Sequence, residues 1–129
     1  MGGGDWNDGM NRVGQNGKGE SVWLGWFLYT TLATFTPHVE ARKQRLRTNR
    51  YRKHLDNLRK ALEEKAWDGD WYRRAYFDDG TPLGSTRNEE CRIDSIAQSW
   101  AVISGASDPY RMGRAMAAVE EDLVRRGDG

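Results

Sequence analysis

The sequence predicts an all-α chain built from helix pairs, as in a helical solenoid or an α/α barrel, with one short loop or hairpin between the pairs. Three observations lead to this prediction. Long stretches carry apolar residues at helical spacing, glycine- and proline-containing turns separate them, and a segment around 67–88 combines aromatic residues with acidic turns. Helix pairs of this kind need neighbours to cover their apolar faces.

The first half of the chain predicts a loop followed by a helix pair. Residues 1–19 are rich in glycine and read as a loop, and the helix pair is expected over 20–66. Its first helix extends from Glu20 to about Gln44 and is apolar nearly all round at its start, which predicts burial on several sides. Pro37 is expected to kink or restart this helix, with Thr36 as a cap.

The second helix of this pair is expected over 48–66, and it is amphipathic. One face carries apolar side chains at helical spacing, namely Tyr51, Leu55, Leu58, Leu62 and Ala66. The opposite face is charged and reads as a solvated surface.

The second half of the chain predicts a loop or small hairpin over 67–88 and a further helix pair over 89–126. A helix is expected from Cys91 to Ser104 and ends at Gly105. Asp108-Pro109 supplies a cap and a first-turn proline for the last helix. The expected buried face of that helix consists of Met112, Met116, Val119 and Leu123.

Composition narrows the class of function. The formal net charge is +1, so the chain has no strong positive electrostatic field that would attract nucleic acid or an acidic membrane. Cys91 is the single cysteine, which rules out an internal disulfide, and no metal-ligand spacing surrounds it. The longest mainly apolar run, 22–35, is too short for a membrane span. We expect neither a metal nor a cofactor.

The segment Asp5-Trp6-Asn7-Asp8 has the composition of a site that acts on glycosidic bonds. A tryptophan offers a flat apolar face to a sugar ring. A carboxyl group beside it can be desolvated and kept protonated near neutral pH. Such a carboxyl group can protonate a departing sugar oxygen.

This segment is the first of several motifs that together resemble a known family. The motifs occur in this order: Asp5-Trp6-Asn7-Asp8-Gly9, Gly19-Glu20-Ser21-Val22-Trp23-Leu24, Trp67-Asp68-Gly69-Asp70-Trp71-Tyr72-Arg73-Arg74-Ala75-Tyr76, Gly84-Ser85 and Asn88-Glu89-Glu90-Cys91-Arg92-Ile93-Asp94-Ser95-Ile96-Ala97-Gln98-Ser99-Trp100-Ala101-Val102. They resemble glycoside hydrolase family 94, which includes cellobiose, chitobiose and 1,2-β-oligoglucan phosphorylases and the C-terminal region of cyclic β-1,2-glucan synthases. The run from Cys91 to Trp100 looks most like the synthase branch.

The resemblance implies a fold and a reaction. The family's catalytic domain is an (α/α)6 barrel, so this chain looks like part of such a barrel, with the flanking parts that hold donor-site and phosphate-binding residues absent. Members cleave or form β-glucosidic bonds with inversion, using phosphate as the nucleophile. The family's general acid corresponds to Asp8, and Trp6 lines the sugar site beside it. Asp5 is an alternative acid, although a role in holding the loop fits it better.

Three further residues are candidates for substrate contact, namely Glu89, Glu90 and Gln98. They belong to a polar cluster at a junction between a loop and a helix. For Glu89, capping of the helix N-terminus is the competing interpretation.

Three readings of function remain open from the sequence. The first is a fragment of a cyclic β-1,2-glucan synthase-like enzyme, with a β-glucan and phosphate as its partners. The second is a fragment of a free-standing β-glucan or cellobiose-type phosphorylase. The third is a non-catalytic helical module that binds glycan or protein through its tryptophans. The first reading implies a location on the cytoplasmic side, in a parent protein that belongs to the inner membrane.

The apolar faces predict how the chain behaves by itself. Each large side chain between Val22 and Leu28 is worth about 1.5–3 kcal/mol when it is buried. Half a barrel leaves some of these side chains uncovered. We therefore expect the isolated chain to be marginally folded or prone to aggregate, and inactive.

Overall fold

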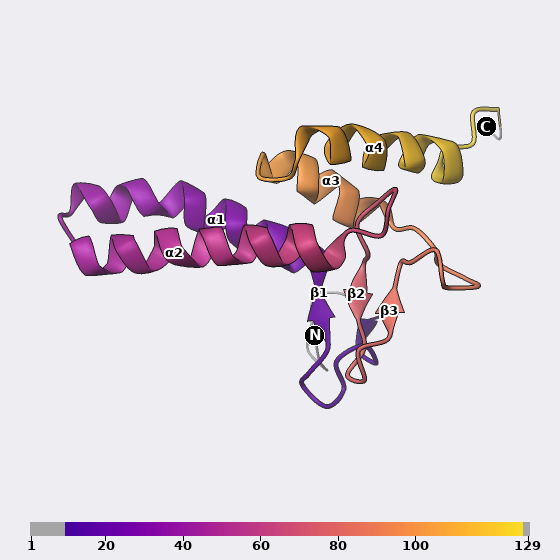
Figure 1. Cartoon of the computed structure of the whole chain (residues 1–129), viewed down its shortest axis with the longest axis horizontal. Helices are drawn as coiled ribbons and strands as arrows, with labels where there is room; N and C mark the ends of the chain where they lie inside the picture. Colours follow the sequence, from indigo (N-terminus) through magenta and orange to yellow (C-terminus); the bar gives the residue numbers. More distant parts are fainter. Residues whose placement is uncertain (1–9, 128–129) are drawn as a thin grey trace.

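The computed structural model describes residues 10–127 and is mostly helical. In chain order the elements are β1 (Glu20–Ser21), α1 (Val22–Ala41), α2 (Arg45–Ala61), the π-helix η2 (Leu62–Ala66), β2 (Ala75–Tyr76), β3 (Pro82–Leu83), α3 (Ser95–Ser104) and α4 (Pro109–Leu123). Figure 1 shows α1 and α2 as a long arm, with α3 and α4 above its base and the three strands below. None of the described helices is long and apolar enough to cross a membrane. The all-α prediction is thus right for the helices and wrong about the sheet.

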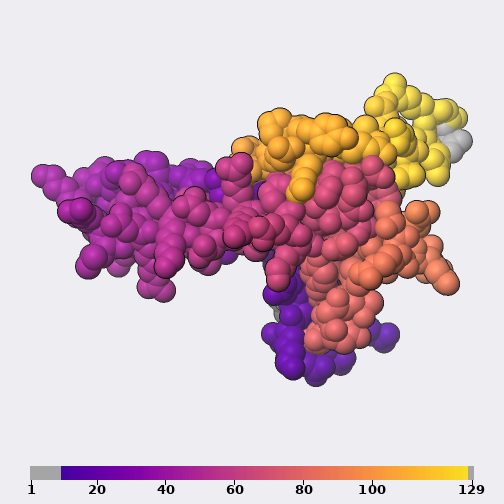
Figure 2. All heavy atoms as spheres, in the orientation of Figure 1, coloured from indigo at the N-terminus to yellow at the C-terminus, as the bar shows by residue number. Residues whose placement is uncertain are grey.

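The arm is an antiparallel helix hairpin that projects from the body of the molecule (Figure 2). The amphipathic pattern predicted for its second helix is confirmed, because Leu62 and Ala66 are buried and Leu58 packs against the core. At the base of the arm α1 approaches η2 so closely that a Cβ atom on Gly25 would lie 2.8 Å from Leu62 Cδ2. Glycine therefore permits the contact between the two elements.

Pro37 does not restart the first helix, so the restart that was predicted as the alternative to a kink is wrong. A single helix, α1, extends through it, and Thr36 is buried inside the helix instead of capping a new one. The Thr36 hydroxyl donates to the Leu32 carbonyl at 2.6 Å. Proline inside a helix lacks a backbone donor, and its ring crowds the carbonyl group four residues earlier. α1 packs along α2, and tertiary packing of this kind supplies most of the stability of a helix in a folded protein.

The strands form a small antiparallel sheet in the order β1-β2-β3. Glu20 pairs with Tyr76, and Ala75 pairs with Leu83. The hairpin predicted within 67–88 is confirmed, but Glu20 and Ser21 were expected to be helical and are instead its third strand. The reason is local: Ser21 has extended backbone angles and its hydroxyl accepts from the Leu24 amide, so it caps α1.

The second helix pair begins later than the sequence predicted. Residues 91–94 are not helical, and α3 starts after Asp94, whose carboxylate accepts from the Ile96 amide at 2.8 Å. The predicted ends are confirmed at Gly105, which has a φ of 62°, and at Asp108, which caps α4 ahead of Pro109. A short polar side chain at the cap and a left-handed glycine at the end are strong local signals.

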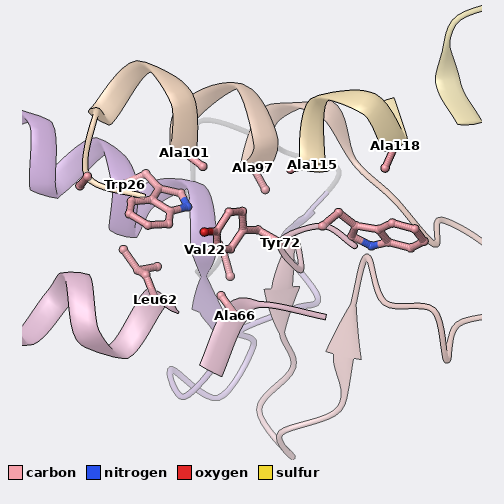
Figure 3. Close-up of a cluster of buried hydrophobic side chains, with 11 residues drawn as sticks. Val22, Trp26, Leu62, Ala66, Tyr72, Ala97, Ala101, Ala115 and Ala118 are labelled. Atoms are coloured by element: carbon pink, nitrogen blue, oxygen red, sulfur yellow. The ribbon is translucent and has the colours of Figure 1, made fainter. Parts of the chain in front are cut away.

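The buried face of α4 is not the predicted methionine stripe. Met116 and Leu123 are exposed, whereas Ala115 and Ala118 are buried. Figure 3 shows these two alanines facing the core together with the small residues of α3. Small side chains let the two helices approach closely. The core cluster consists of Val22, Trp26, Leu62, Ala66, Trp71, Tyr72, Ala97, Ala101, Ala106, Ala115 and Ala118.

Candidate functional site

The residues predicted to carry the chemistry precede the first described residue. Asp5, Trp6 and Asp8 all lie outside the described residues. The described chain starts at Met10, which follows Asp8 after a single glycine. The structure therefore shows how the continuation of this segment is held.

The loop from Met10 to Gly19 is built from short-range turns around one buried side chain. Val13 is buried, and its amide donates to the Met10 carbonyl at 3.1 Å. Gly17 has a φ of 75°, which favours glycine. A Cβ atom on Gly19 would lie 2.3 Å from the Val13 carbonyl oxygen, so the loop folds back on itself there.

A single carboxylate from the hairpin binds this loop. Asp78 Oδ2 accepts from the Asn16 amide at 2.7 Å, and Oδ1 accepts from the amides of Lys18 and Gly19 at 2.7 and 2.9 Å. The Asn16 amide contributes most to lowering the pKa of Asp78, desolvation opposes it, and the Lys18 and Gly19 amides add to the lowering. The carboxylate is therefore held in its charged form.

Glu89 and Glu90 are exposed, in the connection between β3 and α3. Within residues 10–127 their side chains form no hydrogen bond or ion pair. The capping interpretation for Glu89 is wrong, because Asp94 caps α3. Both carboxylates remain accessible for substrate contact.

Gln98 is fully buried, and its amide is occupied by the protein backbone. Its Oε1 accepts from the Tyr72 amide, while its Nε2 donates to the carbonyls of Tyr72 and Asp94. Gln98 therefore joins α3 to the segment before β2. In this arrangement it presents no surface to a sugar.

Sequence reasoning missed two buried charged groups that fix the hairpin. Arg74 is 2% exposed, and its guanidinium contacts Asp94 Oδ2 at 3.3 Å and the Ser21 hydroxyl at 3.2 Å. Asp68 is paired with Arg73 and accepts from the Thr86 amide at 2.7 Å. Nothing in hydrophobic periodicity could indicate these pairs, because both partners lie in segments without a regular pattern.

A second network joins η2 to the start of α4. The Tyr72 hydroxyl bonds to Ser107 and donates to Glu63 at 2.8 Å. Glu63 in turn pairs with Arg111 at 2.6 Å, whose guanidinium lies 5.1 Å from the centre of the Trp67 ring. Burial, reinforced by the nearby Glu63 carboxylate, raises the pKa of Tyr72. The tyrosine therefore serves as a neutral hydrogen-bonding group.

Comparison with known proteins places these motifs in a family. The chain matches the catalytic domain of the glycosyl hydrolase 94 superfamily over residues 1–128. It belongs to that family. The match includes Asp5, Trp6 and Asp8, and it extends over all the elements described above. Membership in family 94 implies that the helix pairs are part of an (α/α)6 barrel.

Individual members of family 94 support the same assignment. The chain is 61% identical over 122 residues to the cyclic beta-(1,2)-glucan synthase NdvB of Rhizobium meliloti, a match that covers 95% of this chain and 4% of that protein. It is 38% identical over 124 residues to the solabiose phosphorylase of Paenibacillus borealis, covering 93% and 16%. It is 32% identical over 120 residues to the cellobionic acid phosphorylase of Neurospora crassa, covering 93% and 15%. The chain thus spans a small fraction of the length of each relative.

Proposed function

We propose that this chain is the segment of a family 94 catalytic domain that supplies the general acid for inverting phosphorolysis of a β-glucosidic bond. Asp8 is the acid, and Trp6 forms one wall of the sugar site beside it. The observation that carries this proposal is the match to the family's catalytic domain over residues 1–128, which contains both residues.

The chemistry explains why one carboxyl group suffices. An inverting hydrolase needs an acid for the leaving oxygen and a base for water. Phosphate is already an anionic nucleophile and needs no base. Asp8 donates its proton to the glycosidic oxygen while phosphate attacks the anomeric carbon, and the products are glucose 1-phosphate and a shortened glycan. Contact with Trp6 and the nearby negative phosphate both raise the pKa of such a carboxyl group, which keeps it protonated.

The substrate class follows from the relative that shares 61% identity, whose name specifies a β-1,2-glucan. We propose that the intact enzyme, meaning the complete gene product that contains this segment, acts on β-1,2-linked glucan chains. The exposed Glu89 and Glu90 are candidates for contacts with the glycan hydroxyl groups. Asp5 holds the acid-bearing loop or contacts the sugar.

The test is the formation of glucose 1-phosphate by the intact enzyme from linear β-1,2-glucan and orthophosphate. Asp8→Asn is expected to lower kcat about 10²- to 10⁴-fold, the usual contribution of a general acid. Asp122→Asn, an exposed change on α4, is the matched control and keeps full activity. Full turnover in Asp8→Asn, with loss in Asp5→Asn, would transfer the role of the acid to Asp5.

Two further outcomes separate the alternative functions. Turnover of cellobiose in preference to β-1,2-glucan supports a cellobiose-type phosphorylase. Binding of glycan without any turnover, unchanged in Asp8→Asn, supports a non-catalytic binding module and overturns the proposal.

A further inference from the structure

We propose that Asp78 is a positioning residue, which holds the loop that carries the acid in its reactive place. The inference rests on the proposed role of Asp8. It concerns a residue on the hairpin, far from Asp8 in the sequence, and it assigns to the hairpin a part in the reaction.

Asp78 binds the loop through hydrogen bonds that the backbone amides of the loop donate to its carboxylate. Three backbone amides of the loop, those of Asn16, Lys18 and Gly19, point at one carboxylate, and both of its oxygens are used. Converging backbone amides form a concave anion site, and hydrogen bonds to an ionised acceptor are the stronger kind. A neutral amide in place of the carboxylate would present a donor to one of these backbone donors.

The carboxylate itself is held by a tight turn. The Phe77 amide donates to the Thr81 carbonyl at 2.9 Å, and the Gly80 amide donates to the Phe77 carbonyl at 2.9 Å. Asp78 therefore lies at the start of the turn that joins β2 to β3. Its position is fixed by the hairpin and not by the loop that it binds.

The same hairpin also holds the chain where it leaves the loop. Directly after Gly19, β1 pairs with β2 through Glu20 and Tyr76. The loop is thus fixed at its exit by strand pairing and in its middle by Asp78. Figure 1 shows the loop and the turn of the hairpin lying side by side below the helices. Met10, at the other end of the loop, follows Asp8 after one glycine, and we infer from this adjacency that displacement of the loop also displaces the acid.

Asp79 provides a matched control. It is the neighbouring aspartate on the same turn, and its pKa is also lowered by backbone hydrogen bonding, in this case from Thr81. Its carboxylate accepts from the Thr81 amide at 2.9 Å and forms no hydrogen bond to residues 10–19. Asp79→Asn removes the same charge from the same turn and leaves the loop contact in place.

The experiment compares Asp78→Asn and Asp79→Asn in the intact enzyme. The first measurement is amide hydrogen exchange in the peptide that covers 10–19. Asp78→Asn is expected to speed exchange there, and Asp79→Asn is not. Unchanged exchange in Asp78→Asn would overturn the proposal, whatever happens to turnover.

The second measurement separates positioning of the acid from loss of structure. Phosphorolysis of β-1,2-glucan needs a protonated leaving oxygen, whereas a 2,4-dinitrophenyl β-glucoside has a leaving group that departs without one. Asp78→Asn is expected to lower kcat on the glucan about 100-fold, the scale of a misplaced catalytic group, and to affect the aryl glucoside far less. Equal losses on both substrates, or no loss on either, would overturn the inference.

Asp8→Asn in the same assays shows which proposal has failed. A selective loss on the glucan in Asp8→Asn, without one in Asp78→Asn, rejects only the positioning role. Absence of a selective loss in Asp8→Asn rejects the proposed acid itself.

Discussion

Gln98 on α3 holds the backbone of Tyr72 at both of its polar groups. Its Oε1 accepts from the Tyr72 amide at 2.8 Å, and its Nε2 donates to the Tyr72 carbonyl at 2.7 Å. The side-chain amide of Gln98 thus forms the two hydrogen bonds that a neighbouring strand would form with the backbone of Tyr72 in a sheet. Backbone groups that are buried need such partners. The segment before β2 is therefore attached directly to the second helix pair.

Replacing Gln98 by leucine is expected to destabilise the chain by about 1–3 kcal/mol for each Tyr72 group left without a partner. The measurement is urea unfolding of the 129-residue chain, followed by circular dichroism, at a protein concentration low enough for the chain to be monomeric. Gln44→Leu is the control, because Gln44 is exposed and its side chain forms no capping bond at α2. Equal free energies of unfolding in the two variants would show that the hydrogen bonds of Gln98 do not stabilise the chain.

Protonation of the Asp68 carboxylate is expected to lower the stability of the folded chain in acid. Burial raises the pKa of its carboxyl group, but hydrogen bonds from Thr86, Arg73 and Ser85 outweigh that effect, so the pKa lies below the ordinary value of 3.8. A lowered pKa means that the stabilisation is fully present above pH 3.8 and is lost as the pH falls through the folded-state value. Asp68→Asn is therefore expected to cost stability at pH 7 and little in strong acid.

The measurement is the free energy of unfolding of both proteins between pH 7 and about pH 2, across the range in which aspartates titrate. Asp56→Asn, an exposed change on α2, serves as the control and is expected to follow the unmodified chain at every pH. The prediction would be contradicted if the free energies of unfolding of Asp68→Asn and the unmodified chain differed by the same amount at every pH.

The Tyr72 hydroxyl predicts a second stability effect. In Tyr72→Phe, Ser107 and Glu63 lose their shared partner in a buried setting, at a cost of about 1–3 kcal/mol. Thermal unfolding measures the change, and Tyr110→Phe is the control because Tyr110 is 77% exposed. A neutral result in Tyr72→Phe would mean that water replaces the hydroxyl group.

A group of aromatic side chains on α1 and α3 leads us to expect that the isolated chain associates. Trp23, Phe27 and Trp100 contact one another, with ring centres 5.1–5.9 Å apart, and Phe27 remains 42% exposed. An exposed apolar ring that packs beside other aromatic side chains promotes association. We expect the 129-residue chain to bind a hydrophobic dye and to elute as oligomers in size-exclusion chromatography.

The single change Phe27→Ser should reduce both signals. Leu46→Ser is its control, since Leu46 is 88% exposed but lies at the start of α2, away from this group. An equal reduction in both variants would mean that general surface polarity, and not the aromatic group, governs association.

Local signals in the sequence predicted local structure well. Gly105 and Asp108 marked a helix end and a helix start because their conformational and capping preferences are intrinsic to the residue. The apolar spacing of Leu58 and Leu62 likewise identified the buried face of the second helix. The prediction that a methionine stripe forms the buried face of α4 was wrong, because periodicity alone cannot show that small alanines make the closer contact.

The contacts that hold the candidate site were beyond prediction from one sequence. Arg74 and Asp94, or Asp78 and Gly19, are far apart along the chain and meet only after the sheet has formed. Their pairing depends on tertiary geometry that no local pattern encodes. Asp8 and Trp6 were predicted from a motif and the family it resembles, which indicate the chemistry and say nothing of how the loop is held.

The carboxylate that binds the loop also dictates an order of events during synthesis. Asn16 and Asp78 are separated by 62 positions, whereas α1 and α2 are joined by a short connection and can pair early. Closing a long loop costs more entropy than closing a short one, and chains emerge from the ribosome N-terminus first. The loop over 10–19 is made before the hairpin, and it must wait for the hairpin to emerge before it acquires its final place. The part of the chain proposed to carry the chemistry is thus translated before the hairpin and reaches its final structure only after it.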